Sequence, residues 1–164
     1  MEKPFKLKNR FEKQIINIIM ERKTFTVAIN ASKEKIWDIL WNDSSYRAWT
    51  SVFMEGSRAE TDWKKGSKAL FTDGKGNGMV STIIENIPNE FMSIKHLGEV
   101  KNGVEDTDSE KVKQWAGSME NYTLKNINGQ TELTLEMDIA EEYMDYFIST
   151  WPKALEKIKE LAEK

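Results

Sequence analysis

The chain has 164 residues, enough for one domain with a hydrophobic core, and 31% of them are charged against 39% that are hydrophobic. Acidic residues outnumber basic ones by 27 to 24, so the formal net charge is −3, which argues against a general nucleic-acid binder with its basic face. The absence of cysteine excludes disulfides, thiol nucleophiles and cysteine-ligated metals, and a single histidine excludes multi-histidine metal sites.

Residues 1–19 are predicted to be an extension that precedes the domain of residues 20–164. Apolar residues recur in it at the spacing of a short amphipathic helix: Phe11, Ile15, Ile18 and Ile19. The apolar run there is interrupted by Asn17, is too short for a membrane span, and precedes no small-residue cleavage site. These features and the lack of cysteine predict a cytoplasmic protein.

A strand and two short helices are predicted next. Residues 24–30 alternate, with Phe25, Val27 and Ile29 on one side, as in a half-buried strand. Ser32 is placed to cap a helix over residues 33–41, whose apolar residues share one face. A second short helix is predicted around residues 46–49.

About six consecutive strands are predicted after the helices, joined by turns. The most distinct turn signals are the glycine-dense segment 74–78 and Asn128-Gly129, which is typical of a hairpin. Residues 98–111 are predicted to be a long, solvated acidic loop, because their acidic residues do not match the calcium-loop spacing. The predicted extended segments are 51–60, 68–72, 79–87, 91–97, 112–126 and 131–139.

A long amphipathic helix is predicted at the C-terminus. Its apolar residues follow helical spacing: Phe147, Trp151, Ala154, Leu155, Ile158 and Ala162. Pro152 removes one backbone donor within this run and favours a kink. The order of elements therefore predicts an α+β fold, a curved antiparallel sheet of about six to seven strands around the C-terminal helix, with two short helices after the first strand. Such an arrangement can leave a cavity between sheet and helix.

Short segments along the chain carry a resemblance to known proteins. They are IWDILW at 36–41, YRAW at 46–49, GNGMV at 76–80, HLGEV at 96–100, GVEDT at 103–107, WAG at 115–117, ENYTL at 120–124 and WPKAL at 151–155. Together they resemble the START-like superfamily, also called SRPBCC or birch-pollen-allergen-like, which has the helix-grip fold. Within it they resemble bacterial proteins related to the C-terminal domain of the activator of heat-shock protein 90 ATPase. The resemblance covers roughly residues 20–164 and implies the helix-grip fold, but the superfamily includes lipid carriers, polyketide cyclases and co-chaperones, so it does not choose a function.

The candidate site residues are expected to line that cavity. His96 shares a strand face with Met92 and Ile94, and an imidazole there can donate or accept a hydrogen bond. On the next predicted strand, Trp115 and Met119 lie on the face opposite Gln114, Ala116 and Ser118. For each residue, ordinary core packing is the competing interpretation. The full set is Trp41, Trp49, Phe53, Met92, Ile94, His96, Trp115, Met119, Tyr143, Phe147 and Trp151.

Three functions remain open at this point, in order of preference. The first is a non-enzymatic domain that binds a small hydrophobic molecule such as a lipid, sterol or polycyclic aromatic. The second is a co-chaperone-like module whose partner is the bacterial heat-shock protein 90 homologue, which only the resemblance suggests. The third is a cyclase, aromatase or hydrolase that uses His96 with a nearby carboxylate as general acid and base. No metal, cofactor, nucleic acid or membrane span is expected.

Overall fold

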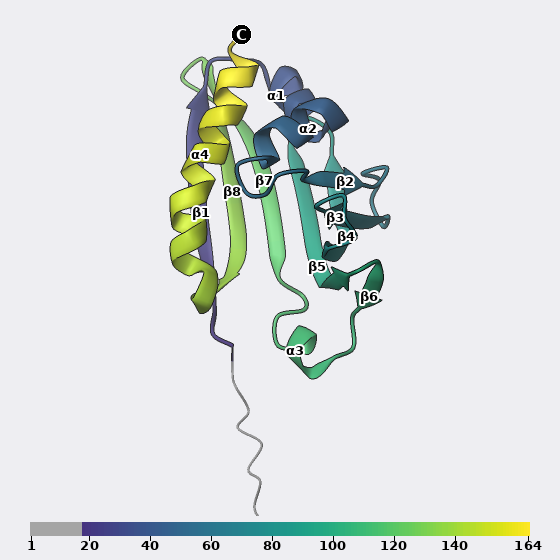
Figure 1. Ribbon diagram of the computed structural model, residues 1–164. Helices are drawn as coiled ribbons and strands as arrows, with labels where there is room; N and C mark the ends of the chain where they lie inside the picture. Colours follow the sequence, from purple (N-terminus) through teal and green to yellow (C-terminus); the bar gives the residue numbers. More distant parts are fainter. Residues whose placement is uncertain (1–17) are drawn as a thin grey trace, which may run out of the picture.

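A single curved antiparallel sheet runs through residues 18–164, the part of the chain that the computed structural model describes (Figure 1). Its strand order is β1-β8-β7-β5-β4-β3-β2, and β6 pairs with β5 beside this path. All of the pairings are antiparallel, as expected for strands joined by tight turns. The strands are β1 (Met20–Ile29), β2 (Arg58–Glu60), β3 (Lys68–Thr72), β4 (Gly78–Ile87), β5 (Phe91–Lys101), β6 (Val104–Asp106), β7 (Met119–Ile127) and β8 (Gln130–Ala140).

The longer helices lie on the concave side of this sheet. In Figure 1, α4 runs along β1 and β8, while α1 and α2 lie across one end of the sheet. The sheet therefore holds the C-terminal helix as predicted, and the helix-grip architecture is confirmed. Among the described residues, no helix is both long and apolar enough to span a bilayer. The helices are α1 (Lys33–Trp41), α2 (Asp43–Thr50), α3 (Glu110–Lys113), a 3₁₀ turn η1 (Glu141–Tyr143) and α4 (Met144–Ala162).

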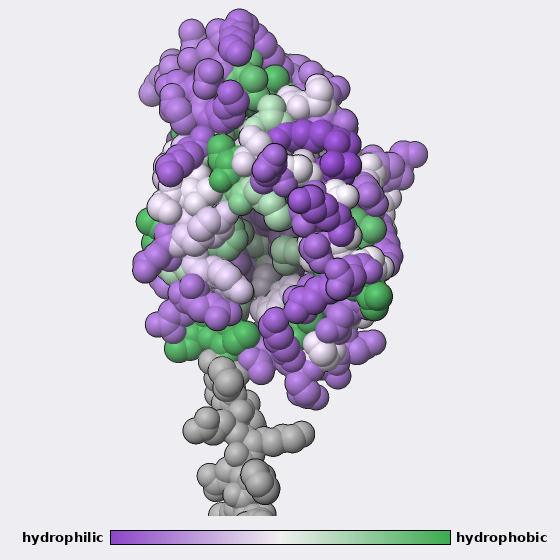
Figure 2. All heavy atoms as spheres, in the orientation of Figure 1, coloured by the Kyte–Doolittle hydropathy of each residue, from purple (hydrophilic) through white to green (hydrophobic). Residues whose placement is uncertain are grey.

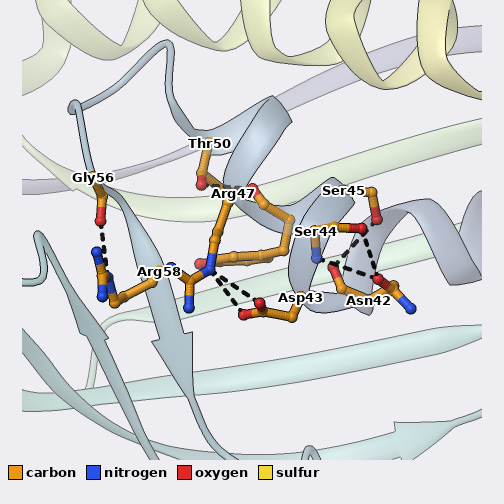
Figure 3. A network of polar contacts seen from close by, with 9 residues as sticks. Asn42, Asp43, Ser44, Ser45, Arg47, Thr50, Gly56 and Arg58 are labelled. Carbon is orange, nitrogen blue, oxygen red and sulfur yellow. Dashed lines mark hydrogen bonds and ion pairs between the residues drawn. The ribbon is translucent and has the colours of Figure 1, made fainter.

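Asn42 sets the sharp turn between α1 and α2. It ends α1, where its backbone N–H bonds to the Asp38 carbonyl, and it caps α2, where its side-chain oxygen accepts from the Ser44 N–H at 3.2 Å. An ion pair between Arg47 and Asp43, at 3.0 Å, supports the first turn of α2 (Figure 3). This turn fixes the orientation of the two helices, and it thereby brings Trp41 and Trp49 to the same end of the core.

The apolar face of α4 is buried as its spacing predicts. Trp151, Ala154, Leu155, Ile158 and Ala162 are all buried, and they pack on β1, β8 and the first two helices. Pro152 lies on the exposed side of α4, which continues through it as helix to Ala162. The carbonyl that loses its backbone donor there can bind water instead.

Three of the predicted segments are corrected by the structure. The expected extended segment over residues 51–60 contains turns and becomes a strand, β2, only at Arg58. The expected strand over residues 112–126 begins only at Met119, because residues 110–113 form α3 and residues 114–117 form a turn. The expected loop over residues 98–111 contains the end of β5 and the short strand β6. Of the predicted N-terminal helix, residues 11–17 lie outside the described residues, and Ile18 and Ile19 are not helical.

Candidate functional site

The concave face of the sheet is not completely covered by helices. The α4 helix packs mainly on β1 and β8, and the first two helices cover one end. In Figure 2, which has the orientation of Figure 1, this face is hollowed between α4 and the β3–β5 side of the sheet. Pale green and white residues, of intermediate hydropathy, surround the hollow, while the outer rim is mostly hydrophilic. In Figure 1, the strands β8, β7 and β5 lie behind this part of the molecule.

A buried row of polar side chains crosses these central strands. Ser81 on β4 pairs with His96 on β5, and the Ser81 Oγ lies 2.7 Å from the His96 Nδ1. The His96 Nε2 lies 3.2 Å from the Oε1 of Glu120 on β7. The Tyr122 hydroxyl donates to the other oxygen of Glu120 at 2.5 Å. We call Ser81, His96, Glu120 and Tyr122 the polar row.

The hydrogen bonds of the polar row determine the tautomer of His96. A carboxylate only accepts hydrogen bonds, so the ring nitrogen that faces Glu120 must carry a proton. In the neutral ring, the Nδ1 is then an acceptor, and the Ser81 hydroxyl donates to it. The row thus directs two donors, from His96 and Tyr122, at one carboxylate.

Burial makes this arrangement costly unless each group keeps its partners. Ser81 is fully buried, whereas 17% of the Glu120 side chain remains exposed. Burial, and then the charge of Glu120, raise the pKa of Tyr122 well above its usual value, and the same two causes act on the pKa of Tyr46. Both phenols therefore stay protonated at neutral pH and can act as donors.

An aromatic cluster adjoins the polar row. The Trp41 ring lies 4.8 Å from that of Tyr122 and 4.7 Å from that of Trp63. The Trp49 indole donates to the Leu40 carbonyl at 3.2 Å. Within the described part of the chain, the buried indole N–H groups of Trp41 and Trp151 have no hydrogen-bond partner. The cluster therefore consists of large apolar rings, and few of its polar atoms are hydrogen-bonded.

Eight of the eleven predicted site residues lie on the concave side of the sheet. All of them are buried in the core or packed against it: Trp41, Trp49, Phe53, Met92, Ile94, His96, Phe147 and Trp151. Core packing therefore explains many of them, as the competing interpretation held. Only His96 among them belongs to the polar row.

The structure does not bring the other three predicted residues to this face. Trp115 lies in the turn after α3, so the alternation inferred for it does not exist. Met119 pairs with Lys95, which is followed by the inward His96, so both point to the convex face. Tyr143 is 53% exposed in η1.

The prediction missed Ser81, Glu120, Tyr122, Tyr46 and Trp63. Glu120 and Tyr122 alternate with polar residues on β7, so a strand that starts at Met119 would have placed a carboxylate on the apolar face. A carboxylate on an otherwise apolar strand face was the signal in the sequence that could have identified Glu120 as a site residue. Ser81 could not have been found this way, because its pairing with His96 depends on an irregularity in the β4–β5 register.

The chemistry open to the polar row is hydrogen bonding rather than nucleophilic attack. Ser81 is the most buried member, and its hydroxyl is hydrogen-bonded to the His96 Nδ1. Glu120 is the most exposed member of the polar row, with 17% of its side chain accessible. Across residues 18–164, no group of three or more His, Asp or Glu is arranged to hold a metal ion.

Comparison with known proteins gives a family match and a set of similar folds. The family described as "Activator of Hsp90 ATPase homolog 1-like protein" matches residues 30–163. No curated protein sequence matches the chain significantly.

Among solved structures, the Aha1 dimer from Colwellia psychrerythraea is similar with a TM-score of 0.64 at 20% identity, covering 87% of this chain and 96% of that one. ChR145 from Cytophaga hutchinsonii has a TM-score of 0.62 at 21% identity, with 87% and 92% covered. CalU16 from Micromonospora echinospora has a TM-score of 0.58 at 14% identity, with 88% and 84% covered. At these identities the likeness shows a shared fold.

Proposed function

The chain belongs to the activator of Hsp90 ATPase homolog 1-like family, and from that premise we propose that it binds a small, largely apolar molecule on the concave face of its sheet. The guest enters the hollow between α4 and strands β3–β5 (Figure 2). Its apolar body packs on the aromatic cluster, and one polar group reaches the polar row. Binding rather than catalysis is the function that this geometry supports best.

The observation that carries the proposal is the polar row itself. A face that served only as core would gain nothing from burying a carboxylate, because charges and hydrogen-bonding groups cost free energy to remove from water. Glu120 is nevertheless held in position by two donors and left partly exposed. Apolar pockets with a few well-placed polar groups are typical of small-molecule sites, where the polar groups set orientation.

Apolar burial would supply most of the affinity. At about 25 cal/mol per Å², covering about 200 Å² of apolar surface is worth about 5 kcal/mol before the costs of association. The polar row would then discriminate between guests of similar shape, because a guest that desolvates Glu120 without donating a hydrogen bond to it binds more weakly.

Thermal unfolding with a panel of guests tests the proposal. The panel contains a fatty acid, a sterol, a flavonoid and naphthalene derivatives with different polar ends. A guest that binds only the folded chain raises the Tm with the logarithm of its concentration. Absence of any response across the panel would contradict the proposal.

Two neighbouring residues of β3 provide a matched pair of variants. Phe71 is partly buried on the concave side, with its ring centroid 6.2 Å from that of His96. Leu70 points the other way, into a separate small groove that Thr72 and Val100 also line. F71W should fill part of the hollow and weaken guest binding, whereas L70W should leave it unchanged. The reverse result would place the guest on the convex side and overturn the proposal.

A second candidate function is a co-chaperone-like interaction. The name of the family and one surface feature support it. Large apolar side chains are exposed on η1, on α4 and on the loop after α2, namely Tyr143, Tyr146, Ile148, Val52 and Met54. Exposed apolar groups of this kind can contact a partner protein. Stimulation of the ATPase of a purified bacterial heat-shock protein 90, reduced in a Y146S/I148S variant, would favour this function over ligand binding.

A further inference from the structure

Glu120 lacks the fixed cationic partner that the partly buried Asp138 has. Asp138, on the opposite face of the neighbouring strand, is bound by Arg22 at 3.0 Å and by the Met119 N–H. Among the described residues, the only basic side chain within ion-pair distance of Glu120 is His96, at 3.2 Å. The ring of His96 carries a positive charge only when it is protonated. The concave face therefore holds a carboxylate whose charge no lysine or arginine of residues 18–164 neutralises.

The lysines nearest in register do not fill this role. Lys23 faces the concave side two strands away, in the row of Met137 and Glu120, and its Nζ binds Glu21 at 3.1 Å. Lys95 on β5 pairs with Met119 and points to the convex face. The site keeps a net negative charge beside apolar surface.

Aromatic rings are grouped around this carboxylate. The Tyr122 hydroxyl donates to Glu120, and the Tyr122 ring packs edge-on against Trp41, with centroids 4.8 Å apart. The Tyr46 ring is 5.7 Å from that of Trp63 and 6.3 Å from that of Phe71, and the charge of Glu120 contributes to raising the pKa of Tyr46. A carboxylate beside a group of aromatic rings can stabilise an organic cation, because the carboxylate accepts charge-assisted hydrogen bonds and nearby rings can add cation–π contacts.

We propose that the polar end of the guest is a protonated amine that donates to Glu120, so that the ligand class is an aryl- or alkyl-ammonium compound with an apolar body. This inference rests on the proposed function, since it names the chemistry of the same site. The ammonium supplies the positive counter-charge that Glu120 lacks, and the rings of Tyr122 and Trp41 lie close to that carboxylate. A carboxylate guest would be repelled, and an alcohol would form a hydrogen bond without the charge.

Three probes with one apolar body separate these possibilities. Isothermal titration calorimetry at pH 7 compares 1-naphthylmethylamine, 1-naphthylmethanol and 1-naphthoate on the full chain. The amine should bind at least tenfold more tightly than the alcohol, and the naphthoate more weakly than both. Because all three probes act on the unmodified chain, this comparison does not depend on how any variant folds.

Two glutamine variants assign the preference to Glu120. E120Q keeps the shape and one acceptor oxygen, which can still receive the Tyr122 hydroxyl bond, but it removes the charge. The affinity for the amine should therefore fall to within about threefold of that for the alcohol, whose own affinity stays within about threefold. E136Q removes the same charge from the convex face of β8, where Glu136 pairs with Asn121. It should leave the tenfold preference intact.

The outcomes distinguish this inference from the function on which it rests. Equal affinities for the three probes, or an amine preference that survives in E120Q, would overturn the ammonium assignment and leave the binding site standing. A loss of preference in E136Q as large as in E120Q would attribute it to net charge, and would overturn the assignment as well. If neither these probes nor the wider panel bind, the proposed function falls and the inference falls with it.

Discussion

Two buried tryptophans differ in one hydrogen bond, and that difference predicts unequal costs for the same substitution. Trp49 on α2 and Trp151 on α4 are 1% and 3% exposed, and their rings lie 6.1 Å apart in the aromatic cluster. The indole N–H of Trp49 donates to the Leu40 carbonyl at 3.2 Å, whereas that of Trp151 has no partner within the described chain. Replacing each tryptophan by phenylalanine, in the variants W49F and W151F, tests this difference.

The magnitude follows from what each substitution removes. Both variants lose one fused ring from a packed core, at about 1–3 kcal/mol of unfolding free energy. W49F also breaks the bond to Leu40, which adds about 1 kcal/mol or more because it leaves a buried carbonyl short of a donor. W151F instead removes an unpaired buried donor, which returns about 1–3 kcal/mol. W49F should therefore be the less stable variant by about 2 kcal/mol.

Urea unfolding followed by circular dichroism measures this difference. For a domain of this size, about 2 kcal/mol corresponds to about 4–8 °C in Tm. The m-values of the two variants should agree, so that the comparison reports stability alone. Equal stabilities, or a W151F variant that is less stable than W49F, would refute the account of how α4 packs against the cluster.

Three further changes have expected outcomes. At Asp138, burial would raise the pKa, but the hydrogen bonds from Arg22 and the Met119 N–H, with the Arg22 charge, lower the pKa overall. The contribution of Asp138 to stability is therefore present above about pH 4 and is lost as the pH falls. Urea unfolding of D138N should show a shallower decline between about pH 5 and pH 2, and an unchanged slope would contradict this. G129A should cost about 1 kcal/mol, because Gly129 has a φ of +79° and a Cβ there meets nothing within 4 Å; a Tm equal to wild type would show that the turn relaxes. P152A should stabilise α4 by restoring a backbone donor, and a lower Tm would mean that packing of the proline ring outweighs it.

Periodicity was enough to predict most elements of this fold. Alternation and helical spacing are local properties, so the helix over residues 33–41, with its Ser32 cap, and the strand over residues 68–72 agree with the structure to the residue. The hairpin at Asn128-Gly129 is confirmed too, with positive φ at both residues.

The region around Trp115 could not be predicted in the same way. Tryptophan, glycine and methionine at every second position fit a strand, but they fit a short helix and turn equally well over so few residues. The prediction that the strand begins at residue 112 also gave the wrong faces for the first residues of β7. Met119 was therefore placed on the concave face, and Glu120, which lies there, was missed.

The polar row depends on contacts that no local pattern contains. The His96–Glu120 contact joins residues 24 apart in sequence and requires the β5–β7 register, and the Ser81–His96 contact requires the register shift next to Val80 and Ser81. A carboxylate near His96 was a condition of the enzyme hypothesis, and Glu120 meets it. Among residues 18–164, the hydroxyl that contacts the His96 ring is that of the fully buried Ser81, so the contact does not by itself provide an accessible nucleophile.

An NMR titration locates the guest most directly. The ¹⁵N-labelled chain is titrated with the tightest-binding member of the guest panel, and backbone amides and indole N–H signals are followed. The account predicts saturable shifts at His96, Glu120 and Tyr122, and at the Trp41 indole, with the convex-facing Glu136 and Leu70 unaffected. Shifts confined to the convex face or to the outer side of α4, with those of the polar row unchanged, would contradict it.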